Sequence, residues 1–368
     1  MPQERTDDQA PGPGGSSPRR RGGRHRALRV TAWTAAGLIV LGGSGLGYLY
    51  VKLNGNIRGI DINAVLGTDR PRDRADGSMD VLVLGSDARS GANAAYGRED
   101  GAARSDTAMI VHVHRGHRSA SVVSIPRDTL VDRPACADGR GGTVPAARSQ
   151  MFNAAYEVGG PSCTVKTVEA MSGIRMDHYV EVDFTGFKKL VDTLGGVRIT
   201  TTRAIDDPKS RLRLPAGTHT LDGEQALGLV RTRHGVGDGS DLGRIQLQQA
   251  FLRSLIARID GIGLFSNPTK LFDAADAATS ALTTDSELDS VTKLAGFAGG
   301  LKNIGADDVD MITLPVAYDP ADPNRVLPLA RQGALVWSAL KADRPVPAAA
   351  TVGSAAGRGD AGRVITTP

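Results

Sequence analysis

Between residues 78 and 343 the chain alternates between two hydrophobic periods. Short apolar or alternating runs, typical of strands, occur in MDVLVLGSD, TAMIVHVH, RSASVVSIPRD, HYVEVDF, VRITTT and VDMITLPV. Helical spacing occurs in TGFKKLVDTLGG, in LDGEQALGLVRTR with its candidate N-cap Asp222, and in RIQLQQAFLRSLIARI. In the last of these, one apolar stripe is predicted, formed by Ile245, Leu252, Leu255, Ile256 and Ile259. Because strands and helices are mixed, and the turn HRGH joins two strands, the pattern predicts a layered α/β domain with a mixed central sheet.

The two ends of the chain differ from this central region. Residues 1–29 are rich in Gly, Pro, Ser and Arg, a composition that predicts disorder. The next 22 residues, Val30 to Val51, carry no charge. They are long enough to cross a hydrocarbon core of roughly 30 Å as a helix. Lys52 to Gly77 is expected to form a stalk, and residues 344–368, rich in Ala, Gly and Pro, a loose tail.

Arginines flank the apolar run unevenly, which predicts its orientation. Six precede it, whereas only Lys52 and Arg58 follow closely; the six are Arg19, Arg20, Arg21, Arg24, Arg26 and Arg29. The positive-inside rule then places the N-terminus in the cytoplasm and the domain outside. A cleaved signal peptide is the alternative, but the run is long and no small-residue cleavage motif clearly follows it. We therefore expect a single-pass protein of the cell membrane with an extracellular domain.

The net charge of +4 comes entirely from the N-terminal tail. Residues 1–30 hold seven arginines and three acidic residues, so the rest of the chain carries 37 basic and 37 acidic groups. Because the domain has no surplus of basic residues, it has no positive electrostatic field that would attract nucleic acid, and we expect no nucleic-acid partner.

Both cysteines, Cys136 and Cys163, fall in the part expected to be extracellular. In an oxidising compartment, two cysteines 27 positions apart favour a disulfide over two buried thiols. Closing such a loop typically stabilises a fold by about 3 kcal/mol.

Two aspartates are expected where neighbouring strands meet one edge of the sheet. Asp87 ends the first predicted strand and Asp106 begins the second, with Arg89 and Arg104 close to them. Two such carboxylates can bind Mg²⁺ through oxygen and leave positions for water and a substrate phosphate. Alternatively, each carboxylate caps a turn or pairs with the arginine near it. The residues alone leave both readings open.

The loop RTRHGVGDGSDLGR gathers charges around glycines. Arg231 and Arg233 end one predicted helix, whereas Arg244 starts the next, with Gln248 one turn along the same face. A cation at a helix start is unexpected, because the helix dipole already makes that end electropositive. A helix N-terminus with convergent arginines predicts an anion site, and this charge density suits a pyrophosphate. Asp241 is interpreted as the N-cap of the second helix.

Arg127, in SIPRDT, is a further candidate for binding phosphate. It follows a proline at a strand exit, where its planar guanidinium can face phosphate oxygens. A surface ion pair with Asp128 is equally compatible with the sequence. His112 and His114 share a strand face, but a zinc site would need a third ligand. No Ser or Cys nucleophile comes with an obvious base, so any chemistry must rest on positioning and electrostatics.

The blocks VLVLGSDAR, RSDTAMIV, VVSIPRDT, FNAAYEVGG, HYVEVDFTGFKKLVDTLGGV and LDGEQALGLVRTRHGVGDGSDLGRIQLQQ follow one another in the order of the LytR–CpsA–Psr family. The chain resembles this family best from Ser78 to Ile259 and more weakly to about Lys341. The resemblance implies one layered α/β/α-type domain at residues 78–343, with a mixed central sheet, behind one transmembrane helix. It also implies a phosphotransferase that moves a glycopolymer, teichoic-acid-like or related, from a polyprenyl-pyrophosphate carrier to peptidoglycan outside the membrane.

The resemblance also assigns site residues. Mg²⁺ would be bound by Asp87 and Asp106. Arg127, Arg233 and Arg244 match the arginines that bind the pyrophosphate, with Arg89 and Arg231 nearby, and Gln248 matches a family glutamine. Asp87, Arg127, Arg233 and Arg244 are therefore expected to carry catalysis, and the group that accepts the proton is left open between Asp87 and Asp241. A polyprenyl-pyrophosphate hydrolase and a non-catalytic lipid-binding or regulatory protein are the alternative functions.

Overall fold

A computed structural model describes residues 47–48, 50–86, 105–138, 141–234, 236, 239–263, 267–357 and 361–366. The chain divides into two units, Met1–Val51 and Lys52–Pro368. The described residues of the first unit, 47, 48, 50 and 51, are helical. The tail 1–29 and most of the run Val30 to Val51 lie outside the described residues. Within the described part of the chain, no helix is both long and apolar enough to span a membrane.

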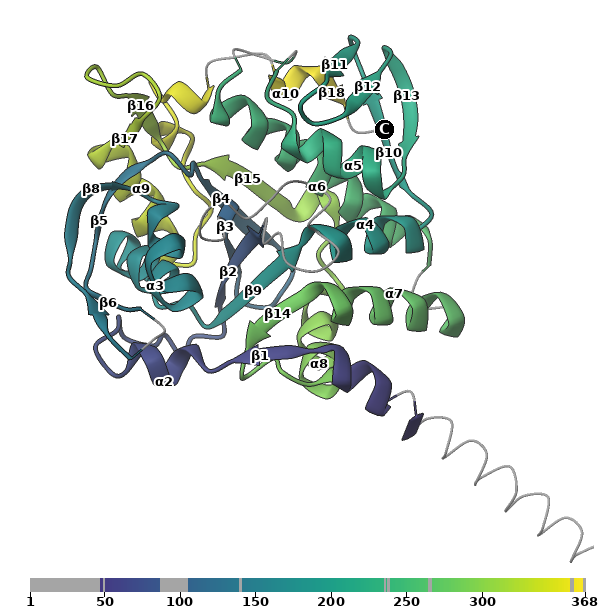
Figure 1. The fold of residues 1–368 in the computed structure, drawn as a ribbon, viewed down its shortest axis with the longest axis horizontal. Helices are drawn as coiled ribbons and strands as arrows, with labels where there is room; N and C mark the ends of the chain where they lie inside the picture. Colours follow the sequence, from purple (N-terminus) through teal and green to yellow (C-terminus); the bar gives the residue numbers. More distant parts are fainter. Residues whose placement is uncertain are drawn as a thin grey trace, which may run out of the picture. The chain divides into compact units, whose positions relative to one another are not determined.

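The second unit is built on a seven-stranded mixed sheet (Figure 1). Its strands, from one edge to the other, are β1 (Arg58–Ile60), β14 (Leu282–Asp285), β9 (His178–Asp183), β2 (Met79–Ser86), β3 (Ser105–Val113), β4 (Ala120–Ile125) and β15 (Val309–Thr313). β3 pairs antiparallel with β2 and β4, while β2 pairs parallel with β9, and β4 parallel with β15. The expected α/β fold with a mixed central sheet is therefore confirmed.

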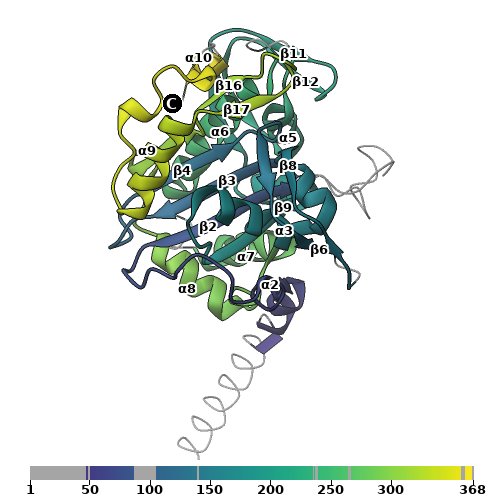
Figure 2. The same cartoon turned by 90° about the vertical axis from the view of Figure 1, so that its left-hand side faces the viewer.

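Helices cover both faces of this sheet, as Figures 1 and 2 show. One face packs against α2 (Ile62–Leu66), α3 (Ala154–Ser172) and α9 (Ala330–Lys341), and the other lies toward α6 (Asp241–Gly261). Alternation along β3 explains the division: Ile110 belongs to the core with α3 and α9, whereas its neighbour Val111 packs in the cluster that includes Ile256 of α6.

A second hydrophobic core lies beside the central sheet. It joins α4 (Phe184–Thr193), α5 (Gly223–Arg231) and α6 to the three-stranded sheet of β13 (Gly217–Leu221), β10 (Val197–Thr201) and β18 (Ile365–Thr366). α6 supplies Leu242 to the first core and Leu247 to the second. Because α6 is buried on several sides, the single stripe predicted for it is only partly right: Ile245 is buried, but the other four residues are half-buried.

The remaining elements complete the fold. Four two-stranded sheets pair β5 (Leu130–Arg133) with β8 (Ala147–Met151), β6 (Cys136–Ala137) with β7 (Thr143–Val144), β11 (Ile205–Asp207) with β12 (Leu212–Leu214), and β16 (Val316–Tyr318) with β17 (Val326–Pro328). Further α-helices of the described residues are α7 (Pro268–Ala281), α8 (Val291–Leu301) and α10 (Ala361–Val364), and short 3-10 helices lie at Ala306–Asp308, Ala348–Ala350 and Ala355–Gly357. The run VDMITLPV, predicted as one strand, is divided between β15 and β16.

The segment 52–77, for which the sequence predicts a stalk, contributes to this folded unit. β1 pairs in parallel with β14, and Ile62 and Leu66 of α2 are buried in the first core. Arg70 makes a buried ion pair with Glu169 of α3, with an N–O distance of 2.6 Å. The C-terminal residues also pack rather than hang loose, since Ala350 and Ala355 join the first core and Ile365 the second. Long-range pairing, which composition does not report, explains both differences.

Cys136 and Cys163 form a disulfide that ties β6 to α3. α3 carries a break at Gly159 and Gly160, where Gly160 has a φ of 60° that glycine adopts without strain. A Cβ at Gly159 would lie 2.5 Å from the carbonyl oxygen of Ala137. The glycine pair of FNAAYEVGG therefore lets the strand and the helix approach closely at the disulfide.

Candidate functional site

The candidate site lies at the loop between α5 and α6. The buried carboxylate of Asp207 accepts hydrogen bonds of 3.0 Å from the backbone N–H groups of Arg233 and His234. Burial raises the pKa of Asp207, but these backbone donors outweigh burial and hold the pKa below its ordinary value. An ionised, buried Asp207 thus fixes the start of the loop after α5.

Asp241 gathers the loop's arginines around one carboxylate. Its Oδ1 accepts a short hydrogen bond from Arg244 and lies 3.4 Å from Nη2 of Arg233. The side chains of Asp241 and Arg244 are buried, at 9% and 4% exposure, while Arg233 is 27% exposed. The interpretation of Asp241 as N-cap was wrong: Ser240 is the N-cap, and Asp241 is the first residue of α6. Its carboxylate therefore remains available to orient guanidinium groups rather than the helix N–H groups.

Arg127 reaches the same carboxylate from the end of β4. Its backbone N–H donates to Oδ2 of Asp241 over 3.3 Å, and its Nε lies 3.7 Å from Oδ1. The Nε also lies 3.7 Å from Oδ2 of Asp128, so the alternative ion pair exists as well. Arg127, Arg233 and Arg244, predicted as one phosphate-binding set, are thus brought together at the N-terminus of α6.

Asp128, which the sequence offered only as an ion-pair partner, is a further ionisable group of the site. Burial raises the pKa of this carboxyl, and the negative charge of Asp241 raises it further, against the opposing charges of Arg127 and Arg233. A carboxyl with a raised pKa next to an anion site is a candidate for proton transfer. Its position directly after Arg127 is the only sequence signal that points to it.

Gln248 connects α6 to the edge of the sheet. Its side-chain amide donates hydrogen bonds of 2.9 Å to the hydroxyl of Thr107 and to the carbonyl of Val230. Thr107 follows Asp106 on β3, so Gln248 fixes the distance between the arginine loop and the strand that carries Asp106. In the structure the side chain of Gln248 thus bonds to two other parts of the chain.

The structure describes the two aspartates predicted to bind Mg²⁺ to different extents. Asp87 and Arg89 lie outside the described residues, and of Asp106 only the backbone, in β3, is described. On β2 and β3, Gly85 pairs with Thr107 and Ser86 with Ser105, with a register irregularity at this point. Asp106 therefore lies beside Ser86, which Asp87 follows directly. Oxygen donors from these two positions fit the preference of Mg²⁺.

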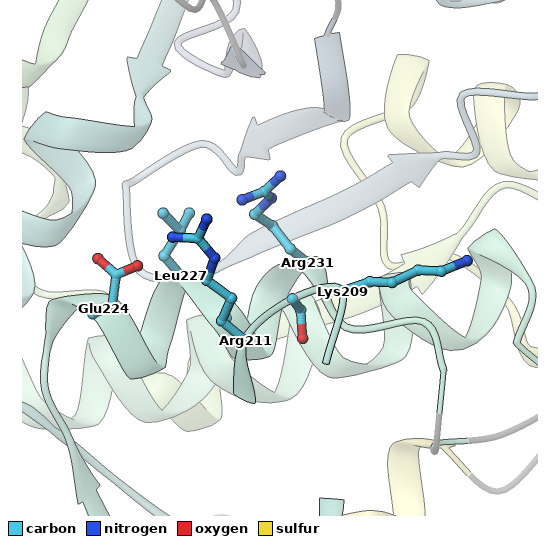
Figure 3. Close-up of a pocket in the computed structure, with 7 residues that line it drawn as sticks. Lys209, Arg211, Glu224, Leu227 and Arg231 are labelled. Carbon is cyan, nitrogen blue, oxygen red and sulfur yellow. The ribbon is translucent and has the colours of Figure 1, made fainter. Parts of the chain in front are cut away.

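Arg231 lines a pocket that Arg127, Arg233 and Arg244 do not line. Its guanidinium stacks over the ring of Phe184, 5.0 Å from the centroid. This pocket is also lined by Lys209, Arg211 and Leu227, and in it Arg211 and Arg231 project to the same side (Figure 3). Its other labelled lining residue is the acidic Glu224. With three cations against one acidic residue, the lining of this pocket is net positive.

Asn153 is a site residue that the sequence analysis quoted without assigning it a role. Its backbone N–H donates to the carbonyl of Arg127 over 3.1 Å, where α3 begins. Its Oδ1 is buried, and within the described part of the chain this atom has no hydrogen-bond partner. Its place in the block FNAAYEVGG is the signal that could have found it.

Comparison with known proteins identifies the family. The sequence model described as the LytR_cpsA_psr family matches residues 49–341. The chain belongs to this family. The cell wall biosynthesis protein LcpA of Corynebacterium glutamicum is 34% identical over an alignment of 308 positions, and the match covers 76% of this chain and 58% of LcpA.

Two further similarities concern TagT. The polyisoprenyl-teichoic acid–peptidoglycan teichoic acid transferase TagT of Bacillus subtilis is 33% identical over 288 residues, covering 75% of this chain and 83% of TagT. A solved structure of TagT bound to LI-WTA matches with a TM-score of 0.54 and 29% identity, over 75% of this chain and 94% of that one. The family membership predicted from the order of motifs is thereby confirmed.

Proposed function

We propose that this chain is a transferase that moves a phosphorylated glycopolymer, teichoic-acid-like or related, from a polyprenyl-pyrophosphate carrier to peptidoglycan. The observation that carries the proposal is the convergence of Arg127, Arg233 and Arg244 on Asp241 at the start of α6. A pyrophosphate needs several cationic partners at one place, and a helix N-terminus adds its dipole. The names of the relatives LcpA and TagT, one concerned with cell wall biosynthesis and one with teichoic acid transfer, support the same activity.

In this reaction a sugar hydroxyl of peptidoglycan attacks the phosphorus that carries the polymer. A new P–O bond forms to that hydroxyl oxygen, and the bond from the same phosphorus to the bridging oxygen breaks, so polyprenyl phosphate leaves. Arg127, Arg233 and Arg244 neutralise the charge that develops on the leaving phosphate. Asp241 holds these arginines in position, and the carboxylate of Asp128, whose raised pKa suits the task, accepts the hydroxyl proton.

Asp87 and Asp106 would hold Mg²⁺ in this proposal. The ion would supply positive charge to the pyrophosphate oxygens. Gln248, bonded to Thr107, keeps the strand of Asp106 at a constant distance from the arginines.

We also propose that residues Val30 to Val51 anchor the chain in the cell membrane, with the N-terminus cytoplasmic and the domain extracellular. The uncharged run and the arginines before it support this orientation. A polyprenyl carrier in the outer leaflet would then reach the domain without leaving the membrane. Labelling of single cysteines placed in residues 1–29 and in an exposed loop of the domain, in intact cells, tests the orientation.

The test of the activity is transfer from a short polyprenyl-pyrophosphate glycan to peptidoglycan oligomers by the full chain in detergent. We expect labelled peptidoglycan that disappears with a chelator and returns with Mg²⁺. Arg233→Ala and Arg244→Ala are each expected to lower transfer by about 100-fold or more. Arg213→Ala is the matched control, because the side chain of Arg213 is 82% exposed and, among the residues that the structure describes, forms its ion pair with Asp206.

The same assay separates the alternative functions. Free phosphorylated glycan without labelled peptidoglycan would make the protein a hydrolase. Tight binding of the carrier with neither product would make it a lipid-binding protein. Arg244 is buried, so Arg244→Ala can fail to fold, whereas Arg233 is partly exposed. If Arg244→Ala does not fold, Arg233→Ala still decides the test.

A further inference from the structure

A second polar cluster lies at the other end of β3. His112 and His114 sit on one face of the strand, as alternate residues do, and Asp343 approaches them from the chain after α9. Oδ1 of Asp343 lies 3.2 Å from Nε2 of His112 and 2.9 Å from Nδ1 of His114. His112 is fully buried, and the side chains of His114 and Asp343 are 12% and 8% exposed. The third ligand that a zinc site requires, absent from the sequence pattern, is thus supplied by a residue 231 positions from His112.

The ring nitrogens that do not face Asp343 are bonded to other groups. Nδ1 of His112 lies 2.8 Å from Oδ1 of Asp80, and Nε2 of His114 lies 2.9 Å from the hydroxyl of Ser121. In metal sites the second nitrogen of a ligating histidine donates to a carboxylate, carbonyl or hydroxyl in this way, which fixes the ring and its tautomer. Both histidines are therefore oriented as metal ligands are.

Charge and spacing favour a dication between these three side chains. With Asp80 on one side and Asp343 on the other, His112 can satisfy both carboxylates only as a buried imidazolium. A metal ion that replaces the protons between the rings and Asp343 would let His112 stay neutral. Two ligand atoms of a tetrahedral zinc site lie about 3.3 Å apart. The distances from Oδ1 of Asp343 to the ring nitrogens of His112 and His114, 3.2 and 2.9 Å, are close to this value.

The carboxylate of Asp343 presents one oxygen to the histidines, since Oδ1 lies near both rings. Nε of Arg115 lies 3.3 Å from Oδ2, whereas Oδ1 faces the rings and also accepts a hydrogen bond of 3.4 Å from the backbone N–H of Arg115. The three ligand atoms all lie within 4.8 Å of one another.

We propose that His112, His114 and Asp343 form a zinc site with two nitrogen ligands, one oxygen ligand and a water. Zn²⁺ accepts mixed imidazole and carboxylate ligands, whereas Mg²⁺ prefers oxygen alone. His112 lies six positions from Asp106 along β3, about 20 Å in a strand. The site is therefore distinct from the proposed transfer site.

The ion would act as a structural clamp. Asp343 adopts a left-handed backbone conformation, with a φ of 50°, immediately after α9. Zn²⁺ bound to Asp343 and to β3 would hold the chain after α9 against the sheet, at the edge where β2 and β4 begin. The folded state would gain stability when the metal binds.

The test is metal binding by the full chain in detergent, purified with a chelator and then titrated with Zn²⁺ and with Co²⁺. We expect one equivalent of Zn²⁺ to bind, the visible absorption of tetrahedral Co²⁺ to appear, and a large excess of Mg²⁺ to compete with neither. His114→Gln and Asp343→Asn should each weaken Zn²⁺ binding by at least about 100-fold, and Asp80→Asn by about 10-fold to 100-fold. Asparagine tolerates the left-handed backbone at position 343, so Asp343→Asn should fold even if another variant does not.

His219→Gln is the matched control, since His219 is half-buried and, within the described part of the chain, its ring bonds to the backbone carbonyl of Pro215. Its Zn²⁺ binding should equal that of the parent chain. No stoichiometric Zn²⁺ binding, or binding that His114→Gln and Asp343→Asn leave unchanged, overturns the proposal. Because the readout is metal binding, failure here leaves the transfer assay and its outcome unaffected.

Discussion

The side-chain amide of Gln248 donates a hydrogen bond of 2.9 Å to the hydroxyl of Thr107. This contact joins α6, which carries Arg244, to β3 at the residue after Asp106. The two halves of the proposed site, one cationic and one acidic, are thus held together by a neutral pair. Its removal should disturb their spacing without changing either set of charges.

Gln248→Leu removes this bond and the one to the carbonyl of Val230. We expect the free energy of unfolding to fall by about 1–3 kcal/mol and transfer to fall at least about tenfold, because the reacting groups lose their relative position. Gln249→Leu is the control: Gln249 bonds to Ser124 and Thr313, on another part of the sheet. Chemical denaturation and the transfer assay measure both effects. Equal loss of activity in the two variants would make Gln248 merely structural.

Asp241→Asn keeps the shape of the side chain but removes the charge that orients three arginines. We expect kcat for transfer to fall by about 100-fold and KM to change less, since the arginines remain but are no longer aligned. Steady-state kinetics with the glycan carrier measure the split. Asp206→Asn, which breaks the exposed pair with Arg213, should leave both constants unchanged. A rise in KM alone would show that Asp241 serves binding rather than alignment.

Replacing Cys136 and Cys163 together by alanine should lower the free energy of unfolding by about 3 kcal/mol. The disulfide joins β6 to α3, and neither element carries any of the three site arginines, so transfer at a temperature where the variant is folded should be retained. Thermal unfolding and amide hydrogen exchange measure the change, and exchange should increase mainly in β6, β7 and the first turns of α3. Reduction of the parent chain should reproduce the loss of stability. Uniformly faster exchange across the sheet would contradict this local assignment.

His178 and Asp285 predict a pH dependence of stability. Nδ1 of His178 lies 3.2 Å from Oδ2 of Asp285. Burial lowers the pKa of His178, but the hydrogen bond and charge of Asp285 outweigh it and raise the pKa above 6.5. Burial likewise raises the pKa of Asp285, but the hydrogen bonds from His178 and from the backbone of Tyr179 outweigh it and hold the pKa below 3.8.

The pair therefore stabilises the fold most at pH values between the ordinary pKa of an aspartate, 3.8, and that of a histidine, 6.5. Its contribution is lost as pH rises through the raised pKa of His178, and also as pH falls through the lowered pKa of Asp285. His178→Gln should reduce the free energy of unfolding more near about pH 5 than near about pH 9. Denaturation of the parent and variant chains at both pH values measures the difference, with His219→Gln as control, since the ring of His219 bonds to a backbone carbonyl rather than to a carboxylate. A loss that is the same at both pH values would mean that His178 contributes packing alone.

Much of the fold could be predicted because its signals are local. The run Met79 to Ser86 is a strand, and Asp222 is an N-cap whose side chain accepts from Gln225 in a capping box. The arginine-rich loop was also recognisable, because its charges lie within fourteen positions of one another. The packing of segment 52–77 onto the sheet has no local signal, since the pairing of β1 with β14 joins residues more than 200 positions apart.

The sequence by itself determined the alternation of strands and helices, the cysteine pair and the arginine-rich loop, while Asp87 and Asp106 as Mg²⁺ ligands stay a prediction that rests on the family resemblance. The first three can be read from periodicity, residue identity and charge along short stretches of chain. Only the tertiary structure decided that Asp241 orients the arginines rather than caps α6, and that Asp343 completes the cluster of His112 and His114. Each of these depends on the angle at which a distant segment meets β3 or β4, and that angle is set by the packing of α6 and α9 on the sheet.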